Sequence, residues 1–508
     1  MSPRLSGPDC AAPPAARKPV AAPAPAPVPS PASASASASA SAPVPSPGRT
    51  LAAALLGFFV ITLDASVVTV ALPSIGTDLH GGLAALQWVV DGYTLVFAAF
   101  MLSTGALSDR IGAGRAFGAG MAVFTAASAA CGLAPGLGVL IGTRVVQGTA
   151  ASVMLPASLA LVRQAYPDAG STPHPSGAAS GRIGRARAIA LWAAGGASAV
   201  ALGPVAGGAL TSAWSWRAIF FINLPVGLLA AVLLARTPRS PRRPAPLDVP
   251  GQLTAVLGLA ALTFAVIEGG GLGLVAAAVA VAVLAGFFLI EARSAHPVVP
   301  LGLFRDRTVA VCVAVGAALS FAFYGMIFVL SLFFQQVRDQ SPLGAGLMFL
   351  PMTALIPAVN IVSGRLSALS PPSAGGGTVG ARLPMLAGQL LMVAGLLVLL
   401  PVTARTPAAL LAVVMVPLGL GGALAVPPLT AALLDATPAD RAGLAAGVLN
   451  AGRQIAGALS VAAFGALVAD RDRFLSGMRV CLLLSAALLT VTAVATAAAL
   501  RPGRPADS

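Results

Sequence analysis

The chain has 508 residues, of which 57% are hydrophobic and only 9% are charged, and its mean hydropathy is +0.90. This composition excludes a soluble globular domain and predicts an integral membrane protein. The net charge of +14 does not indicate a nucleic-acid partner, because the arginines are scattered through short segments and form no basic stripe.

The two ends of the chain are predicted to be tails. Residues 1–49 are dominated by Ala, Pro and Ser and cannot bury enough large apolar surface to fold, so we expect a disordered tail. The first long apolar block starts near Leu51 and continues past Val70, which disfavours a cleaved signal peptide. Residues 501–508 form a second, short tail.

The rest of the chain predicts an all-α membrane protein with fourteen transmembrane helices. An even number of spans places both termini on one side, and 22 of the 30 basic residues then fall in segments on that side. The excess of positive charge identifies this side as cytoplasmic in a multi-pass protein of the cell membrane. The expected spans are 51–73, 84–107, 113–133, 137–161, 188–211, 217–235, 250–267, 271–290, 308–334, 344–364, 383–401, 408–433, 443–469 and 478–499.

The spans group as six, two and six. We expect an N-terminal six-helix bundle over residues 50–236, a central two-helix hairpin with basic links over 237–307, and a C-terminal six-helix bundle over 308–500. The Ser-Gly-Arg-Leu sequence at 363–366 resembles the start of the segment 105–115, which indicates two duplicated, pseudo-symmetric halves.

Residues 105–115, Gly-Ala-Leu-Ser-Asp-Arg-Ile-Gly-Ala-Gly-Arg, form a tight charged bridge between the second and third spans. Glycines allow the helix ends to approach, and the acidic and basic side chains can lock neighbouring helix ends by charge-assisted hydrogen bonds. We expect a cytoplasmic gate here, formed by Gly105, Asp109, Arg110, Gly112 and Arg115.

In the N-terminal half, three charged residues interrupt apolar spans. An ionised Asp64 inside the first span would cost about 2.5–3.5 kcal/mol, so we expect it to pair, to face a cavity or to bind a proton, with a helix-capping role as the alternative. Arg144 in the fourth span must find a carboxylate or other acceptors. Asp91 follows Trp88 near the outer end of the second span and is either a proton carrier or a solvated residue at the mouth.

Two further motifs combine small or polar residues with an apolar helix. Gly203, Pro204, Gly207 and Gly208 predict a pliable helix with a flat face, serving as a hinge or only as a packing seam. In the thirteenth span, one polar group either lines a central cavity or joins neighbouring helices. Its members are Asn450, Arg453 and Gln454.

These motifs resemble the fourteen-helix drug:proton antiporter branch of the major facilitator superfamily, over residues 51–500. The resemblance includes the bridge 105–115, although Ala113-Gly114 stands where a second basic residue is usual, the Leu-Asp sequence of 63–73, and residues 144–151. The Gly-Pro sequence of 203–208 resembles the signature of antiporters within that superfamily. The resemblance implies the major facilitator fold and a role of Arg144 in proton transfer.

No enzyme or cofactor chemistry is indicated. The sequence has no phosphate-binding loop, no nucleophile with a base and no metal-ligand spacing, and its four cysteines and three histidines are dispersed. We expect a monomeric antiporter that exports lipophilic small molecules against protons by alternating access between the two bundles. The alternatives are a proton-linked nutrient importer of the same fold and a membrane receptor or scaffold without transport activity.

Overall fold

The structure is a computed structural model that describes residues 47–166, 184–234, 248–294, 297–369, 378–438 and 441–500. Within these ranges the regular structure is helical, with one short 3-10 turn at Leu301–Arg305 and a π-helical turn at Phe333–Val337. The α-helices are α1 (Pro47–Asp78), α2 (Leu83–Ile111), α3 (Ala113–Gly132), α4 (Leu137–Ala165), α5 (Arg185–Ala213), α6 (Ala218–Phe221), α7 (Asn223–Leu234), α8 (Val249–Glu268), α9 (Gly270–Arg293), α10 (Arg307–Leu332), α11 (Pro342–Thr353), α12 (Ile356–Leu369), α13 (Thr378–Val398), α14 (Ala408–Val414), α15 (Val416–Asp435), α16 (Ala442–Leu467) and α17 (Phe474–Ala499).

The helices coincide with the predicted spans. Each of the fourteen expected spans overlaps one helix or two consecutive helices. In the described ranges, eleven helices are long and apolar enough to cross a membrane, and Ala218–Leu234 forms a shorter apolar segment. The predicted all-α membrane fold is therefore confirmed.

Several helix boundaries differ from the expected ones. The helix α1 already begins at Pro47, inside the expected tail 1–49, because proline fits the first turn of a helix, where its missing N–H is not needed. Three expected spans are split: α6 ends at Phe221 before α7, α11 ends at Thr353 before α12, and α14 ends at Val414 before α15. A proline near each break removes a backbone hydrogen bond and interrupts the helix. The expected tail 501–508 lies outside the described residues.

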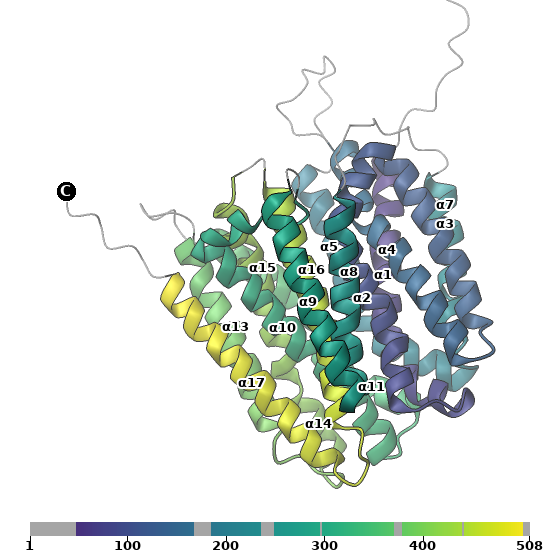
Figure 1. Cartoon of the computed structure of the whole chain (residues 1–508). Helices are drawn as coiled ribbons and strands as arrows, with labels where there is room; N and C mark the ends of the chain where they lie inside the picture. Colours follow the sequence, from purple (N-terminus) through teal and green to yellow (C-terminus); the bar gives the residue numbers. More distant parts are fainter. Residues whose placement is uncertain are drawn as a thin grey trace, which may run out of the picture. The chain divides into compact units, whose positions relative to one another are not determined.

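The helices form two bundles of the same design and a central hairpin (Figure 1). In the N-terminal bundle (α1–α7), α1 packs against α5 and α3 against α4; in the C-terminal bundle (α10–α17), α10 packs correspondingly against α16 and α13 against α15. The second membrane-length segment of each half contacts the fifth of the other half, as α2 with α16 and α11 with α5. This exchange is the relation expected for two parallel repeats.

The two ends of the bundles are named here by the residues they carry. The terminal face carries Pro47, Gly112 and Gly184, and the opposite face carries Gly82 and Trp214. Within the described ranges, the hydrogen bonds between the two bundles run from mid-height toward the opposite face. They are Gln87 to Val461 O (3.0 Å) and Ala462 O (2.7 Å), Ser331 to Thr69 O (3.0 Å), Gln335 to Val70 O (2.9 Å), Leu343 N to Ser212 (3.0 Å) and Thr353 to Ala201 O (3.1 Å).

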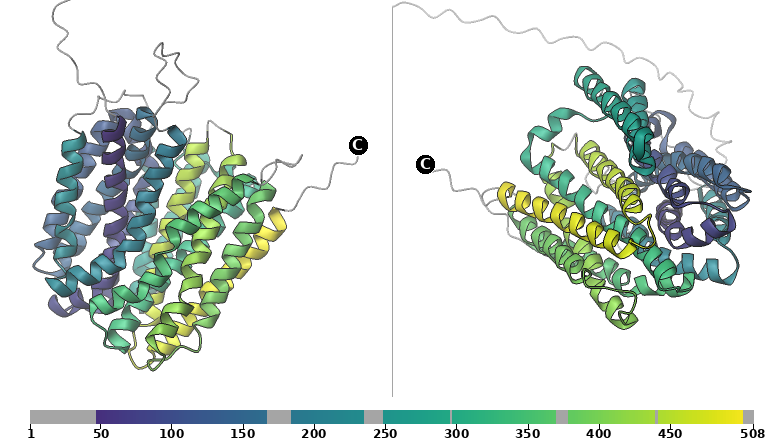
Figure 2. Two further views of the ribbon diagram at one scale, coloured as in Figure 1. Left: turned by 180° about the vertical axis from the view of Figure 1, so that it is seen from behind. Right: turned by 60° about the horizontal axis from the view of Figure 1, so that its bottom comes forward.

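Large apolar side chains fill the space around this contact. One continuous core extends from Leu72 in α1 through Phe328 in α10 to Leu418 in α15. Figure 2 shows the two bundles side by side from behind and from a tilted direction. The bundles are therefore joined tightly toward the opposite face, by hydrogen bonds as well as apolar packing.

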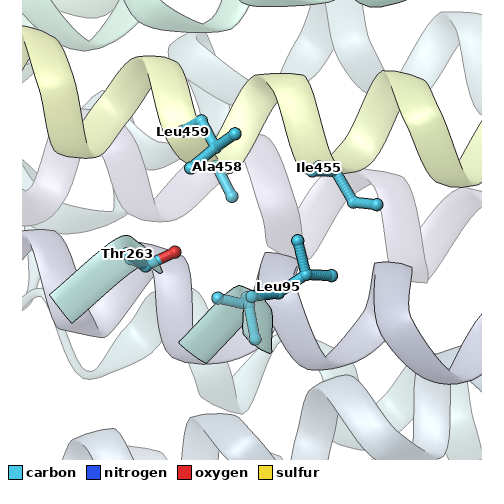
Figure 3. Close-up of a pocket in the computed structure, with 6 residues that line it drawn as sticks. Leu95, Thr263, Ile455, Ala458 and Leu459 are labelled. Atoms are coloured by element: carbon cyan, nitrogen blue, oxygen red, sulfur yellow. The ribbon is translucent and has the colours of Figure 1, made fainter. Parts of the chain in front are cut away.

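The central hairpin (α8–α9) lies along the contact between α2 and α16, because α8 packs against both. Figure 3 shows Leu95 of α2, Thr263 of α8, and Ile455, Ala458 and Leu459 of α16 around a narrow apolar crevice. Gln252 of α8 also donates to the carbonyl of Ala99 at 2.7 Å. The hairpin therefore touches both bundles, while much of α9 remains exposed on its outer side.

Candidate functional site

A buried polar cluster lies inside the N-terminal bundle, around the carboxyl group of Asp64. We call it the Asp64 cluster, and its side chains are all fully buried. Arg144 forms an ion pair with Asp64 Oδ2, while Gln147 Nε2 and Asn223 Nδ2 donate to Asp64 Oδ1 at 2.9 and 2.8 Å. The members of the cluster are Asp64, Ser128, Arg144, Gln147 and Asn223.

Four helices bring these residues together. Asp64 comes from α1, Ser128 from α3, the Arg144–Gln147 pair from α4 and Asn223 from the start of α7. Because residues three apart lie on one helix face, Arg144 and Gln147 point in the same direction, and Arg144 Nη1 donates to Gln147 Oε1 at 2.7 Å. Ser128 Oγ accepts from Gln147 Nε2 at 2.7 Å and from Asn223 Nδ2 at 3.2 Å.

The guanidinium of Arg144 has several partners besides Asp64. Its Nε donates to the carbonyl of Val89 at 3.1 Å, and its Cζ lies 4.2 Å from the ring centroid of Tyr93. Tyr93 itself donates to the carbonyl of Ile61 at 3.1 Å. Arg144 is thereby held between α1, α2 and α4, where aromatic faces and carbonyl dipoles favour a cation.

The hydrogen bonds of Asp64 fit a carboxylate. All three of its side-chain partners are N–H donors, and an ionised carboxylate only accepts hydrogen bonds. A buried charge pair of this kind is stable only when its remaining polar groups are also satisfied. Of the three behaviours expected for Asp64, pairing is the one observed, and the alternative of a helix-capping or interfacial residue is wrong, because Asp64 is fully buried.

Asp91 is fully buried as well, and its carboxyl oxygens have no hydrogen-bond partner of good geometry in the described part of the chain. The nearby Thr94 hydroxyl donates instead to the carbonyl of Val90, at 3.1 Å. One helical turn to either side, Gln87 hydrogen-bonds α16 and Leu95 packs with Ala458 of α16. Asp91 therefore lies on the side of α2 that faces the other bundle. The alternative of a solvated mouth residue is wrong, because the Asp91 side chain is fully buried.

The expected gate residues lie at the terminal face. The helix α2 ends at Ile111, and Gly112 makes the turn to α3 with a φ of 93°, a conformation that a side chain would strain. Asp109, Arg110 and Arg115 are exposed, and within the described ranges they form no ion pair with one another. Gly105, one turn or more earlier in α2, has no atom within 4 Å of the position that a Cβ would occupy.

The glycines of the predicted hinge allow α5 to approach two other helices. At Gly203 a side chain would collide with Ser66 of α1, and at Gly207 a Cβ would lie 2.5 Å from the carbonyl oxygen of Val67. Gly208 faces α11 instead, where the backbone of Pro342 fills the space of a side chain. Close packing is therefore one function of this segment, and α5 continues through Pro204 without a break.

The polar group of the thirteenth span is divided between different surroundings. Arg453 Nε donates to Ser320 of α10 at 3.2 Å, within the C-terminal bundle. Asn450 is exposed and Gln454 is half-buried. Arg453 thus joins two helices, which is the second of the two roles considered for this group.

Three members of the Asp64 cluster were not predicted as site residues. Gln147 lies three residues after Arg144, a spacing that could have indicated a common helix face. Asn223 follows a segment in which Trp216 is buried and, together with Arg217, binds Asp78 at the end of α1. A lone asparagine after this aromatic segment gave no signal of a site. Ser128 has no distinguishing pattern in the sequence.

The chain is similar to proteins named for drug resistance. It is 38% identical to the multidrug resistance protein Stp of Mycobacterium tuberculosis, over 83% of this chain and 75% of that protein. It is also 38% identical to a methylenomycin A resistance protein of Streptomyces coelicolor (83% and 86% covered). A tetracenomycin C resistance and export protein of Streptomyces glaucescens is 32% identical (84% and 76% covered).

Solved structures of transporters share the fold. A transporter of the POT family in complex with 5-aminolevulinic acid superposes with a TM-score of 0.63 at 13% identity, covering 90% of this chain and 96% of that one. A bacterial homologue of the lysosomal transporter Spinster, in an inward-facing conformation, gives 0.59 at 16% identity, with 91% and 99% covered. The sequence model of the Major Facilitator Superfamily matches residues 54–461. The predicted resemblance to the drug-efflux branch is confirmed by these relatives, and the chain belongs to the Major Facilitator Superfamily.

Proposed function

We propose that this protein exports lipophilic small molecules across the cytoplasmic membrane in exchange for protons. The observation that carries the proposal is the Asp64 cluster, in which a carboxyl group is fully buried and paired with Arg144 inside an apolar bundle. Ionisable residues within membrane-spanning helices are costly, and they mark proton and substrate pathways. The resistance and export functions that name the relatives support the direction of transport.

Asp64 is the proposed proton carrier. Removing one partner of a buried ion pair costs about 3–5 kcal/mol, because the other charge stays buried without compensation. Neutralising Asp64 with a proton has a similar consequence for Arg144, so the proton is taken up together with a movement that gives Arg144 new partners or water. This dependence couples the proton to the conformational change. The membrane potential contributes about 2.3 kcal/mol per charge per 100 mV.

Asp91 is proposed as a second protonation site at the contact between the bundles. An ionised carboxylate in this unpartnered position carries a desolvation cost that the protonated form avoids. Opening the contact between α2 and α16 admits water and removes that cost, so the protonation of Asp91 is linked to whether this contact is closed or open. Asp91→Asn, which cannot ionise, is expected to retain membrane insertion and to slow export several-fold while leaving Asp64 functional. If Asp91→Asn exported substrate at the wild-type rate throughout pH 6 to 8, Asp91 would be excluded from the coupling.

The gate and the hinge are assigned to the two ends of the molecule. We place the terminal face in the cytoplasm, since the basic residues concentrate there. With the bundles joined toward the opposite face, this conformation is then inward-facing. In the outward-facing state, residues of 105–115 would hold the cytoplasmic side closed through Asp109, Arg110 and Arg115. The Gly203–Gly208 packing would act as both hinge and seal, in a monomer surrounded by lipid.

Transport assays in two steps test the proposal. A screen of tolerance on expression across chemically diverse toxic compounds identifies a substrate. Transport of this substrate into everted vesicles, which corresponds to export from the cell, is then measured with and without an imposed pH gradient. The same measurement is made with the Asp64→Asn variant. We expect gradient-dependent transport that is lost in Asp64→Asn, although this variant inserts normally. Equal transport with and without the gradient would reject proton coupling, and gradient-driven accumulation in the opposite direction would indicate a nutrient importer.

A further inference from the structure

The side chain of Asn223 is a buried amide with one half of its hydrogen-bonding capacity in use. Nδ2 donates to Asp64 and to Ser128, but Oδ1 is buried and accepts no hydrogen bond in the described part of the chain. Buried amide oxygens normally accept a hydrogen bond, so this unpaired acceptor requires an explanation. Asn223 also stands at the first residue of α7, directly beside the carboxyl group proposed to carry the proton.

We propose that Asn223 is a positioning residue that hydrogen-bonds the Asp64 carboxyl group in both of its protonation states, by rotating its side-chain amide. The inference rests on the proposed function, in which Asp64 gains and loses a proton. When Asp64 is ionised, Nδ2 donates to Asp64 Oδ1, at the observed 2.8 Å. When Oδ1 of Asp64 carries the proton, it becomes a donor, and the rotated amide presents its own Oδ1 as the acceptor.

The other partners of Asp64 cannot make this exchange. Arg144 has only donors. Gln147 has an acceptor, but its Oε1 already receives the hydrogen bond from Arg144 Nη1 at 2.7 Å, so rotation of this amide would break that bond. Rotation of either amide ends two donated hydrogen bonds, to Asp64 and to Ser128, but Asn223 loses no accepted hydrogen bond in addition, since its Oδ1 has none in the described part of the chain. It is therefore the partner of Asp64 that can reverse its role at the least cost.

Neighbouring groups are compatible with the rotated amide. The hydroxyl of Ser128 now accepts from Asn223 at 3.2 Å, and a hydroxyl can donate as well as accept, so it can turn its proton toward the rotated oxygen. The proton added to Asp64 changes no other covalent bond. Besides Asp64 on α1, the ionisable groups near Asn223 are Tyr93 on α2, Cys131 on α3 and Arg144 on α4.

Infrared difference spectroscopy can follow both groups. The chain contains three asparagines, Asn223, Asn360 and Asn450. A double variant, Asn360→Ser with Asn450→Ser, leaves Asn223 as the single asparagine, which is then labelled with ¹³C in the side-chain carbonyl. Spectra of the full chain in lipid vesicles are recorded at high and low pH. The band of the protonated Asp64 carboxyl is assigned by its loss in Asp64→Asn.

We expect the labelled amide band to shift with the same pH midpoint as the Asp64 carboxyl band, and this shift to disappear in Asp64→Ala, which adds no second labelled asparagine. In Asn223→Leu, the Asp64 carboxyl band should move to the frequency of a carboxyl without an acceptor. If Asp64 titrates while the amide band stays constant, the inference is wrong and the proposed proton carrier stands. If Asp64 never titrates, the proposed function fails and this inference fails with it. The labelled double variant decides the question even if Asn223→Leu does not fold.

Discussion

The two bundles share a helix arrangement but differ in what they bury. In the N-terminal bundle, Asp64, Asp91 and Arg144 are fully buried. The fully buried polar side chains of the C-terminal bundle, within the described ranges, are neutral, as in the contacts of Gln389 with Thr492 and Thr496. The same fold thus supports an ionisable interior in one half and a neutral interior in the other. This difference locates the proposed proton chemistry in the N-terminal bundle and makes the other bundle its structural partner.

The largest difference between the bundles should appear at their interior arginines. Arg144→Leu leaves the Asp64 carboxylate buried without its counter-charge, so we expect the free energy of unfolding to fall by about 3–5 kcal/mol and export to be lost. Arg453→Leu removes a half-buried side chain that donates a hydrogen bond to Ser320. We expect this variant to lower the free energy of unfolding by about 1.5–3 kcal/mol. Unfolding in detergent and vesicle efflux measure the two effects. Equal losses of unfolding free energy and of export in both variants would contradict the proposed difference between the bundles.

A second comparison uses one helical glycine from each bundle. In Gly207→Ala the new Cβ would lie 2.5 Å from the carbonyl oxygen of Val67, and overpacking of this kind costs about 1–3 kcal/mol. In Gly452→Ala it would meet only Val313, at 3.4 Å, so a gain of about 0.5–1 kcal/mol is expected from helix propensity. Melting temperatures test whether Gly207→Ala is destabilised and Gly452→Ala is stabilised. A stabilised Gly207→Ala variant would argue against the close packing of α1 and α5.

Two buried glutamines separate stability from coupling. Gln147→Leu and Gln389→Leu each remove hydrogen bonds from buried groups, and we expect a similar loss of about 1–3 kcal/mol from both. Only Gln147 contacts Asp64, so only its replacement should alter the pH dependence of export. Efflux rates measured from pH 6 to 8 provide the comparison. If Gln389→Leu also changed the pH dependence of export, the proton chemistry would involve both bundles.

The smallest expected effects concern exposed charges. Asp109→Asn should change the free energy of unfolding by no more than about 0.5 kcal/mol, since the side chain is exposed and forms no ion pair within the described ranges. It should nevertheless slow export several-fold, because the proposed gate needs this carboxylate when the terminal face closes. Asp470→Asn, exposed on the C-terminal bundle, is the matched control with no expected effect on export. Equal export by both variants would exclude Asp109 from the gate.

The sequence predicted the helices better than the side-chain contacts. Long apolar blocks are sufficient to identify spans, and the proline breaks within α11–α12 and α14–α15 shift only local boundaries. Asp64 and Arg144 were identified because charges in apolar spans are costly. Ser128 and Asn223 carry no such cost signal, and only the packing of α3 and α7 against α1 brings them to the same carboxyl group. For Asp91 the sequence left two roles open, and only the packing of α2 with other helices shows that the side chain is buried.

Proton movement driven by substrate is the most direct test of the central claim. In proteoliposomes with no imposed pH gradient, a gradient of the substrate identified by the tolerance screen is applied, and the internal pH is recorded. The wild-type protein should move protons opposite to the substrate, and Asp64→Asn should show no proton movement. Substrate-driven proton flux in Asp64→Asn equal to that of the wild type would contradict the assignment of Asp64 as the proton carrier.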